Sequence, residues 1–565
     1  MKPRILPVLI CFMLVGCAAP QGAPRSPNGD PSQGVEVPKR LVAAISGEPP
    51  ALYRALIPPG LVTQAADVAD TVVNMGLTVV DDAGIRRAML SEDVPTAENG
   101  LWKVLPDGRM ELTWKIRPGV VWHDGTPLTA DDLRFTLDVI QDPELPEFRA
   151  PSVTMIEQVE VVAPSTIKTT WSRPFIRADR LFSTGSDGLG RPVPRHLTAQ
   201  AFAENKEAFR QLPYWSSEYV GLGPYRLKEW VIGSHMLLEA NDRYVPGKPK
   251  IDLLEIRFIL DANALTANVL SGAVHATIGT GLALEQAVEV RDQWADGKLL
   301  VAYENWIVIY PQFINPNPPI VANLQFRRAL LHAIDRQAMA DTIQAGLVPV
   351  AHSYASPGDP EYRETESMVV KYDYDVTRAA RMLEDLGYVR GPDGGFRDAA
   401  GQRLTMEVRA TASPAIHTKS LFPVADYWQR LGIAIDPVVI PVQRAADSEY
   451  RTQQPTFEVM RHPNGPDNAE RLQSAEAPLP ETRYAGRNRS RYMNPEFDAL
   501  VDRYLATIPT APRMQAFGAI VHHISDQLNA MGLFYDLRTT LVSNRLMNVP
   551  AQNPTWNIHL WDVKS

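Results

Sequence analysis

Cysteine is the scarcest residue of the chain: Cys11 and Cys17 are the only two among 565 residues. Both lie near the N-terminus, so no disulfide can join distant parts of the chain. A chain of this length can bury a large apolar core and does not need a disulfide to fold. Beyond the first 16 residues, no stretch is apolar enough to cross a bilayer.

Motifs for catalysis and metal binding are also missing. The sequence has no Gly-x-Ser-x-Gly nucleophile elbow, no His-Glu-x-x-His zinc helix and no P-loop. His522 and His523 are adjacent and would point in different directions on a helix, which makes them poor ligands for one metal ion. The net charge of −9, with dispersed Lys and Arg, argues against nucleic-acid binding. We therefore expect no metal, no cofactor, no nucleic-acid partner and no enzyme activity.

The first residues resemble a bacterial export signal. Lys2 and Arg4 precede a short apolar run, and the segment Leu14-Val15-Gly16-Cys17 looks like a lipobox, in which the cysteine is acylated. We expect 1–16 to be a removable signal peptide and Cys17 to carry a lipid. Residues 17–36 are then a flexible tether, rich in Pro, Ser and Gly. The protein is expected at the periplasmic or extracellular face, anchored to the membrane by that lipid. A plain secretory signal with a chance cysteine is the alternative.

A strand, turn, strand, turn, helix order occupies Trp114 to Leu137 and the residues just before it. Apolar and polar residues alternate from Met110 to Ile116, which predicts a half-buried strand. Asp124-Gly125 predicts a tight turn. Thr129 stands three residues before Asp132, a pattern that starts helices. Along the rest of the chain, predicted strands and helices alternate.

Several motifs together resemble one family. The segment WKIRPGVVWHDGTPLTADDLRFTL at 114–137, the glycine-rich segment at 221–225 and the segment RRALLHAIDR at 327–336 are similar to motifs of bacterial extracytoplasmic solute-binding proteins. The family is that of the peptide/nickel ABC importers, solute-binding family 5. We expect these motifs to shape the fold rather than to touch ligand.

The resemblance implies a periplasmic-binding-protein-like α/β fold with two lobes, an extra domain and a ligand cleft at the hinge. The first lobe is expected to be discontinuous, with the segments 37–83, 218–302 and 532–565. The extra domain would be 84–217 and the second lobe 303–531. The lobes would close over ligand by a hinge motion.

The resemblance also implies which segments face the cleft, and aromatic walls with a few polar anchors are expected there. Peptide-binding relatives carry an aspartate after the strand that begins near Phe457, which pairs with the peptide amino group, and Asp467 falls there. The Asp-Tyr-x-Asp-Pro motif that is usual in those relatives is absent from this segment. Trp306 and Tyr310 either stack on ligand or pack a core strand. The predicted ligand-binding residues are Glu48, Trp306, Tyr310, Asn315, Arg461, His462 and Asp467.

The sequence thus predicts a monomeric substrate-binding lipoprotein that captures peptides or related small solutes. Its partners would be the ligand, the transmembrane subunits of an ABC permease and, through the lipid, the membrane. Oligosaccharides, opine-like compounds and metal chelates are alternative ligands. A ligand-binding surface receptor in signalling, a folding helper and a hydrolase on the same fold are alternative functions.

Overall fold

The computed structural model describes residues 38–57, 63–148, 151–185, 188–279 and 281–564. Residues 39–565 form one compact unit. The predicted signal peptide (1–16), Cys17 and the tether (17–36) lie outside the described residues. In the described part of the chain, no helix is long and apolar enough to span a bilayer.

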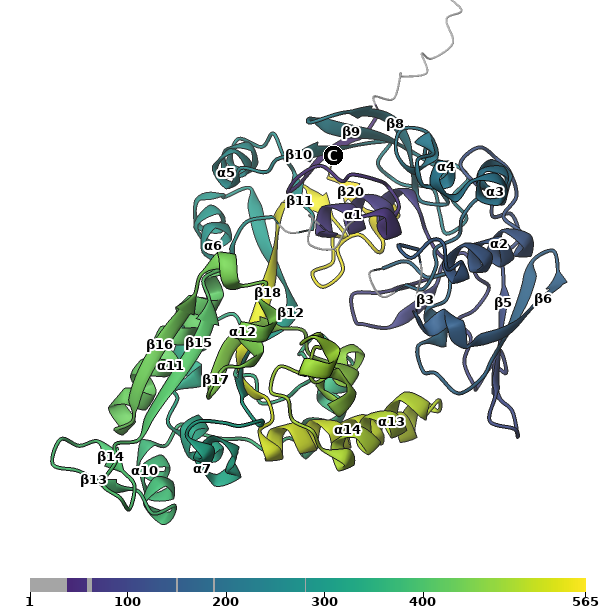
Figure 1. Ribbon diagram of the computed structural model, residues 1–565. Helices are drawn as coiled ribbons and strands as arrows, with labels where there is room; N and C mark the ends of the chain where they lie inside the picture. The colour runs from purple at the N-terminus through teal and green to yellow at the C-terminus, as the bar shows by residue number, and fades with distance from the viewer. Residues whose placement is uncertain (1–37, 58–62, 149–150, 186–187, 280, 565) are drawn as a thin grey trace, which may run out of the picture. The chain divides into compact units, whose positions relative to one another are not determined.

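A ten-stranded mixed sheet forms the centre of the fold (Figure 1). Its strands come from both ends and the middle of the sequence, so neighbours in the sheet are often far apart in the chain. In spatial order the strands are β16 (Ala434–Ile440), β15 (Thr405–Thr411), β17 (Phe457–His462), β12 (Gly297–Pro311), β18 (Met531–Ser543), β11 (Ala276–Thr277), β1 (Arg40–Ile45), β10 (Leu253–Phe258), β9 (His235–Ala240) and β8 (Tyr225–Val231).

The long strands β12 and β18 are antiparallel partners over most of their length. Strand β12 pairs with β18 from Gly297 to Ile309, and its last residues, Trp306 to Pro311, also pair with β17. The pairing shifts register between Tyr303 and Asn305, where an extra residue, Glu304, is inserted. A bulge of this kind bends a strand. The two strands therefore connect the two ends of the sheet and bend near residue 304.

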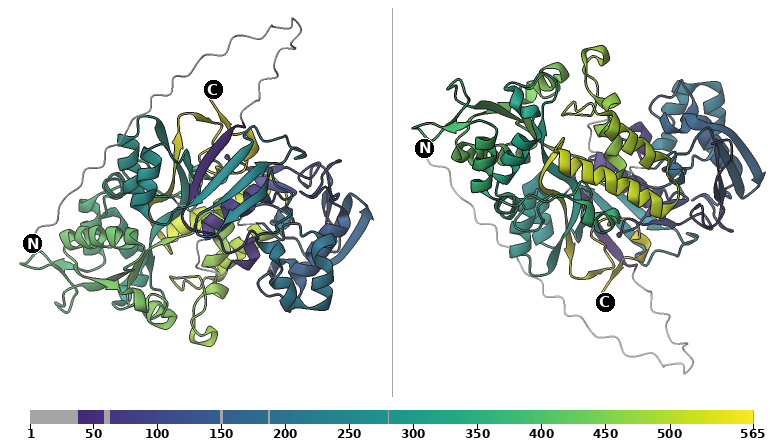
Figure 2. Two further views of the ribbon diagram at one scale, coloured as in Figure 1. Left: turned by 90° about the horizontal axis from the view of Figure 1, so that it is seen from above. Right: turned by 90° about the horizontal axis from the view of Figure 1, so that it is seen from below.

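Strand β1 is buried on both faces, and its two faces belong to two different apolar clusters. Leu41, Ala43 and Ile45 belong to the main core, whereas Val42 and Ala44 pack under two helices, α5 (Ala262–Leu270) and α6 (Leu284–Gln293). The left view of Figure 2 shows the purple strand β1 beside the teal strand β10, its parallel partner. Nearly continuous apolar sequence is what a strand buried on both faces requires.

Residues 84–217 contain a separate four-stranded antiparallel sheet. Its strand β5 (Met110–Lys115) alternates buried and less buried residues, as predicted. Helix α2 (Ala130–Gln141) packs on it and begins with a capping box, in which Asp132 accepts from the backbone N–H of Thr129 at 2.9 Å. In spatial order the strands are β4 (Trp102–Val104), β5, β7 (Thr166–Trp171) and β6 (Ile156–Ala163).

His123 joins two of the sequence motifs. Its Nδ1 accepts from the backbone N–H of Gly221 at 3.1 Å, and its Nε2 lies 3.0 Å from the carbonyl oxygen of Gly223. A Cβ added to Gly223 would lie 2.3 Å from the backbone carbon of Val73, so only glycine fits there. Burial lowers the pKa of His123 to about 4, which keeps the imidazole neutral and suits one donated and one accepted hydrogen bond. The motifs at 114–137 and 221–225 therefore hold the fold together, as expected.

The third motif ties helices to the sheet. It spans α7 (Leu324–His332) and the start of α8 (Arg336–Ile343), where Asp335 caps α8 by accepting from the Ala338 N–H at 2.9 Å. Arg336 is buried and donates to the carbonyls of Gly532 and Tyr372 at 2.9 and 2.6 Å. The Arg336 guanidinium therefore links the backbone of β18 to the backbone at Tyr372.

The remaining elements complete the layers around the two sheets. In the sequence, a helical pattern runs from Arg513 to Met531, which predicts a helix over these residues. The prediction is wrong at its end, because Leu528 adopts the left-handed conformation, with φ of 49°, and Met531 already begins β18. The other helices and small strands are α1 (Thr63–Val73), α3 (Arg195–Glu204), α4 (Lys206–Arg210), α9 (Glu361–Glu364), α10 (Val376–Asp385), α11 (Ala415–Leu431), α12 (Ser448–Thr452), α13 (Pro495–Ala506), α14 (Thr510–Gln527), β2 (Thr78–Val80), β3 (Arg86–Ala88), β13 (Val389–Arg390), β14 (Phe396–Arg397), β19 (Leu546–Met547) and β20 (Asp562–Val563).

Candidate functional site

A cavity of about 430 Å³ lies where segments from the whole length of the chain meet. Its walls combine carboxylates, side-chain amides, threonines and one arginine with glycines, valines and prolines. Among the described residues that line it there is no aromatic side chain, which differs from the aromatic walls expected from the sequence. The lining comes from residues 68–84, 184–185, 279, 304, 358–359, 464–468, 538 and 552–555.

The bulge in β12 contributes one charge of this cavity, and β18 contributes another. Glu304 is the inserted residue of the bulge and is exposed in the cavity wall. Arg538 lies on β18, donates to the carbonyl of Gln552 at 2.6 Å and is attracted by the charge of Glu304. Burial lowers the pKa of Arg538. The bend of the sheet therefore carries a carboxylate and a guanidinium into the cavity.

Asp359 is the most perturbed acid of the cavity. It accepts from the backbone N–H of Ser356 at 2.7 Å, and burial raises its pKa to about 7. The negative charges of Glu361 and Asp467 push in the same direction. A carboxyl group with a pKa near neutrality, in a cavity, is typical of a functional site. It can hold a proton or pair with a ligand cation.

Asp467 is the one predicted ligand-binding residue that lines this cavity. It lies in the first turn of the short 3-10 helix Pro466–Leu472 and forms an ion pair with Arg180, which comes from the segment 84–217. Burial alone would raise its pKa, but the charges of Arg180 and Arg177 outweigh that effect and lower it. The carboxylate is therefore ionised and has a cation of the protein beside it.

Trp306, Tyr310 and His462 lie together in the sheet. Trp306 and Tyr310 have exposed fractions of 1% and 0%, and Trp306 packs edge-on against Tyr354 with ring centres 5.3 Å apart. The Tyr310 hydroxyl lies 2.9 Å from Nδ1 of His462. Burial lowers the pKa of His462 to about 3. These surroundings favour the packing role for the two aromatic residues, one of the two roles that the sequence left open.

Glu48, Asn315 and Arg461 lie away from the cavity. Glu48 accepts from the Trp230 indole at 2.7 Å and from the Gly233 N–H at 2.9 Å, which ties β1 to the turn between β8 and β9. Asn315 is exposed in a left-handed turn, and Arg461 pairs with Asp536 at 3.3 Å. A ligand contact by any of these residues stays a prediction.

Sequence reasoning missed Glu304, Asp359, Asn464 and Arg538. Asn464 could have been predicted from the sequence, because it belongs to the same segment as Asp467. The other three lie in segments that no motif marks, and they meet only after the chain has folded. The spacing of residues along the sequence does not show which distant residues come together in the folded protein.

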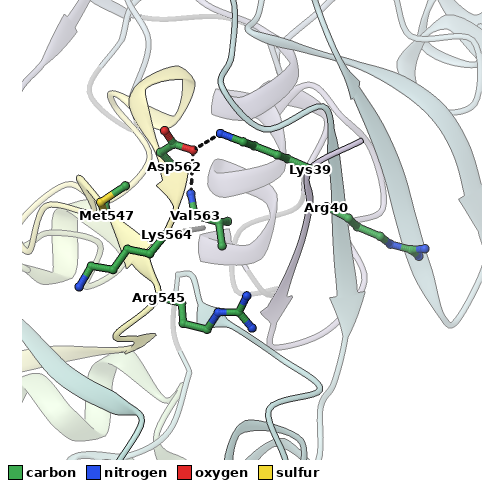
Figure 3. Close-up of a pocket in the computed structure, with 7 residues that line it drawn as sticks. All are labelled: Lys39, Arg40, Arg545, Met547, Asp562, Val563 and Lys564. Carbon is green, nitrogen blue, oxygen red and sulfur yellow. Dashed lines mark hydrogen bonds and ion pairs between the residues drawn. The ribbon is translucent and has the colours of Figure 1, made fainter. Parts of the chain in front are cut away.

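A second hollow, of about 540 Å³, lies at the edge formed by β1, β19 and β20 (Figure 3). Lys39 pairs with Asp562 at 2.8 Å, and Arg40 pairs with Glu255. The figure shows Arg40 and Lys564 pointing away from each other. The charges of this hollow do not converge on a common point, so we do not assign a ligand to it. In the described part of the chain there is no group of acidic, histidine or cysteine residues that could hold a metal ion.

Comparisons with known proteins agree with this architecture. The family model for bacterial extracellular solute-binding proteins, family 5, matches residues 96–484. The oligopeptide-binding protein AppA of Bacillus subtilis is 25% identical over 452 residues, which are 78% of this chain and 76% of AppA. A putative ABC transporter peptide-binding protein of Brucella ovis is 25% identical over 291 residues, and the match spans about half (51%) of each protein.

Solved structures show the same fold. HbpA2 of Haemophilus parasuis superposes with a TM-score of 0.73 at 18% identity, covering 93% of this chain and all of that chain. The oligopeptide-binding protein of Thermus thermophilus, solved with a pentapeptide, gives a TM-score of 0.64 at 22% identity and covers 93% and 96%.

The fold is that of the periplasmic binding proteins, as the sequence predicted. The chain belongs to family 5 of the bacterial extracellular solute-binding proteins, and it is a solute-binding protein of the ABC importer type. The resemblance found in the sequence is confirmed.

Proposed function

We propose that the protein captures a short peptide or a related small polar solute in the 430 Å³ cavity and delivers it to the permease of an ABC importer. The observation that carries this proposal is the cavity, because its walls come from both sides of the bend in the sheet. The volume lies at the small end of the usual range of about 300–1,000 Å³ for ligand pockets. A small ligand therefore fits better than a long peptide.

The charges of the cavity support a zwitterionic ligand. Arg538 offers a guanidinium for a carboxylate, and Asp359 offers a carboxyl group for a cation. Side-chain amides of Asn464 and Gln552 add hydrogen bonds in the wall. The two ends of a short peptide carry the matching charges. Nothing in this role requires chemistry on the ligand.

The hinge that such capture requires is proposed at the bulge of β12. The first lobe would comprise 37–83, 218–302 and 532–565, the extra domain 84–217, and the second lobe 303–531. The boundary at 302/303 then falls at the register shift beside Glu304. Because ligand would contact both lobes only in the closed form, binding should favour closure.

We expect native mass spectrometry of the purified protein to detect a co-purified small solute. Adding the solute so identified should lower the radius of gyration in X-ray scattering and raise the melting temperature, because the ligand binds the closed folded state. Arg538→Gln should abolish both effects, with Arg381→Gln, an exposed second-lobe arginine, as control. Product formation from the solute, lost in the Arg538→Gln variant, would favour an enzyme instead.

We also propose that the protein is held on the membrane surface by a lipid on Cys17. The Gly16-Cys17 step at the end of the apolar run supports this. Replacing Cys17 with alanine is expected to abolish lipid labelling and recovery in the membrane fraction. Equal recovery of the variant and the parent with membranes would contradict the anchor.

A further inference from the structure

Two arginines of the segment 84–217 meet two acids of the segment 303–531. Arg177 donates to both carboxylate oxygens of Glu470, at 2.8 and 2.5 Å, and to the backbone carbonyl of Asp467 at 3.0 Å. Arg180 pairs with the carboxylate of Asp467. The partners are 287 to 293 residues apart in the sequence. We call Arg177, Arg180, Asp467 and Glu470 the interlobe cluster.

The geometry of the cluster is that of a strong contact. A two-pronged arginine–carboxylate pair is stronger and more specific than a single hydrogen bond. The side chains of Arg177 and Glu470 are 14% and 23% exposed, so solvent screens this pair less than a surface ion pair. Arg180 is 15% exposed, but its partner Asp467 is 47% exposed, so solvent screens the second pair more. A backbone hydrogen bond from Ile176 to the carbonyl of Leu505, at 3.3 Å, lies beside them.

Other residues hold the arginines in place. Asp179, between Arg177 and Arg180, pairs with Arg86 of β3 at 3.3 Å, and Arg86 is itself 10% exposed. Arg86 also donates to the hydroxyl of Ser183 at 3.1 Å. The short helix Ala178–Arg180 is therefore fixed to its own lobe, and its arginines are presented to the other one.

The cluster also changes what the cavity offers to a ligand. Asp467 lines the cavity, and it is the carboxylate that the sequence assigned to a ligand amino group. Here a guanidinium of the same chain lies against it, so a ligand cation would have to displace Arg180 to use it. Asp359, in the same cavity, has no arginine or lysine paired with it in the described contacts.

We propose that the interlobe cluster is a latch: it holds the extra domain and the second lobe together before any ligand binds, with Arg180 in the place of a ligand cation. The latch reduces the fraction of ligand-free molecules that are open, so ligand meets a narrower set of conformations. It also directs a ligand cation toward Asp359, away from Asp467.

The latch is tested on the ligand-free chain by the distance between two spin labels. Labels replace the exposed residues Gln158 and Glu481, in a full chain with Cys11→Ser and Cys17→Ser, which removes both native cysteines. The double variant Arg177→Gln/Arg180→Gln is expected to lengthen the mean distance by more than about 2 Å, the scale of a domain rearrangement. Arg173→Gln, an exposed arginine nearby, is the control and should leave the distance unchanged. An unchanged distance in the double variant overturns the latch and leaves the proposed function untouched.

Charge reversal separates a latch from a general loss of packing. Arg177→Glu/Arg180→Glu should open the protein, and adding Asp467→Arg/Glu470→Arg should bring the distance back. Failure of the fourfold variant to restore the distance would overturn the proposal, because reversed ion pairs at the same places should attract as the native ones do. The fourfold variant also decides the matter if the double variants fold poorly.

Discussion

Replacing Trp306 with alanine is expected to lower the free energy of unfolding by about 3–5 kcal/mol. The side chain is 1% exposed and lies in β12 between β17 and β18. It packs against Tyr354, and a Cβ on Gly532 would come within 3.0 Å of its ring, so β18 is also in close contact with it. Alanine would leave a cavity that these rigid strands fill poorly.

Urea unfolding measures this loss, with Ile232→Ala as the control. Ile232 is 86% exposed, so its replacement should change the unfolding free energy by less than about 0.5 kcal/mol. The ligand affinity of Trp306→Phe, which keeps a ring, should stay close to that of the parent. Full stability of the alanine variant together with lost affinity would instead assign Trp306 to ligand stacking.

Local elements could be predicted from the sequence because their causes are local. Asp261, Asp335, Asp375 and Asn494 each precede a helix and accept from a backbone N–H three residues later. The spacing that makes a cap is visible in the sequence. The end of α14 was missed because Leu528 to Met531 continue an apolar pattern, while the left-handed residue Leu528 ends the helix.

The site was harder to predict because its causes are not local. The family resemblance led to the segment around Asp467, which lines the cavity, but not to its partner, Arg180, which lies 287 residues earlier. Glu304 enters the cavity only because a bulge inserts it between paired residues. Trp306 and Tyr310 have the composition of a ligand wall, but a buried strand needs the same residues, and only burial separates the two roles.

Replacing Asp359 with asparagine is expected to stabilise the protein at pH 8 and to have little effect at pH 4. The folded state raises the pKa of this carboxyl group from 3.8 to about 7, so its contribution to stability is fully present below pH 4 and is lost as the pH rises through 7. This pKa difference limits the gain in unfolding free energy of the asparagine variant to about 4 kcal/mol at pH 8. Partial access to solvent in the cavity should reduce the gain to about 2 kcal/mol. Asparagine keeps the acceptor for the Ser356 N–H and does not titrate.

The measurement is the unfolding free energy of parent and variant between pH 4 and pH 8, with Asp385→Asn, an exposed acid of the proposed second lobe, as control. The advantage of Asp359→Asn should grow with pH, whereas the control should show no such growth. A constant difference across this range would mean that Asp359 titrates normally. Asp359 destabilises the ligand-free protein at neutral pH. Such a cost in stability is expected of a residue that serves ligand binding. The same variant should therefore bind a cationic or zwitterionic ligand more weakly at pH 8, where the parent carboxylate is charged and the asparagine is not.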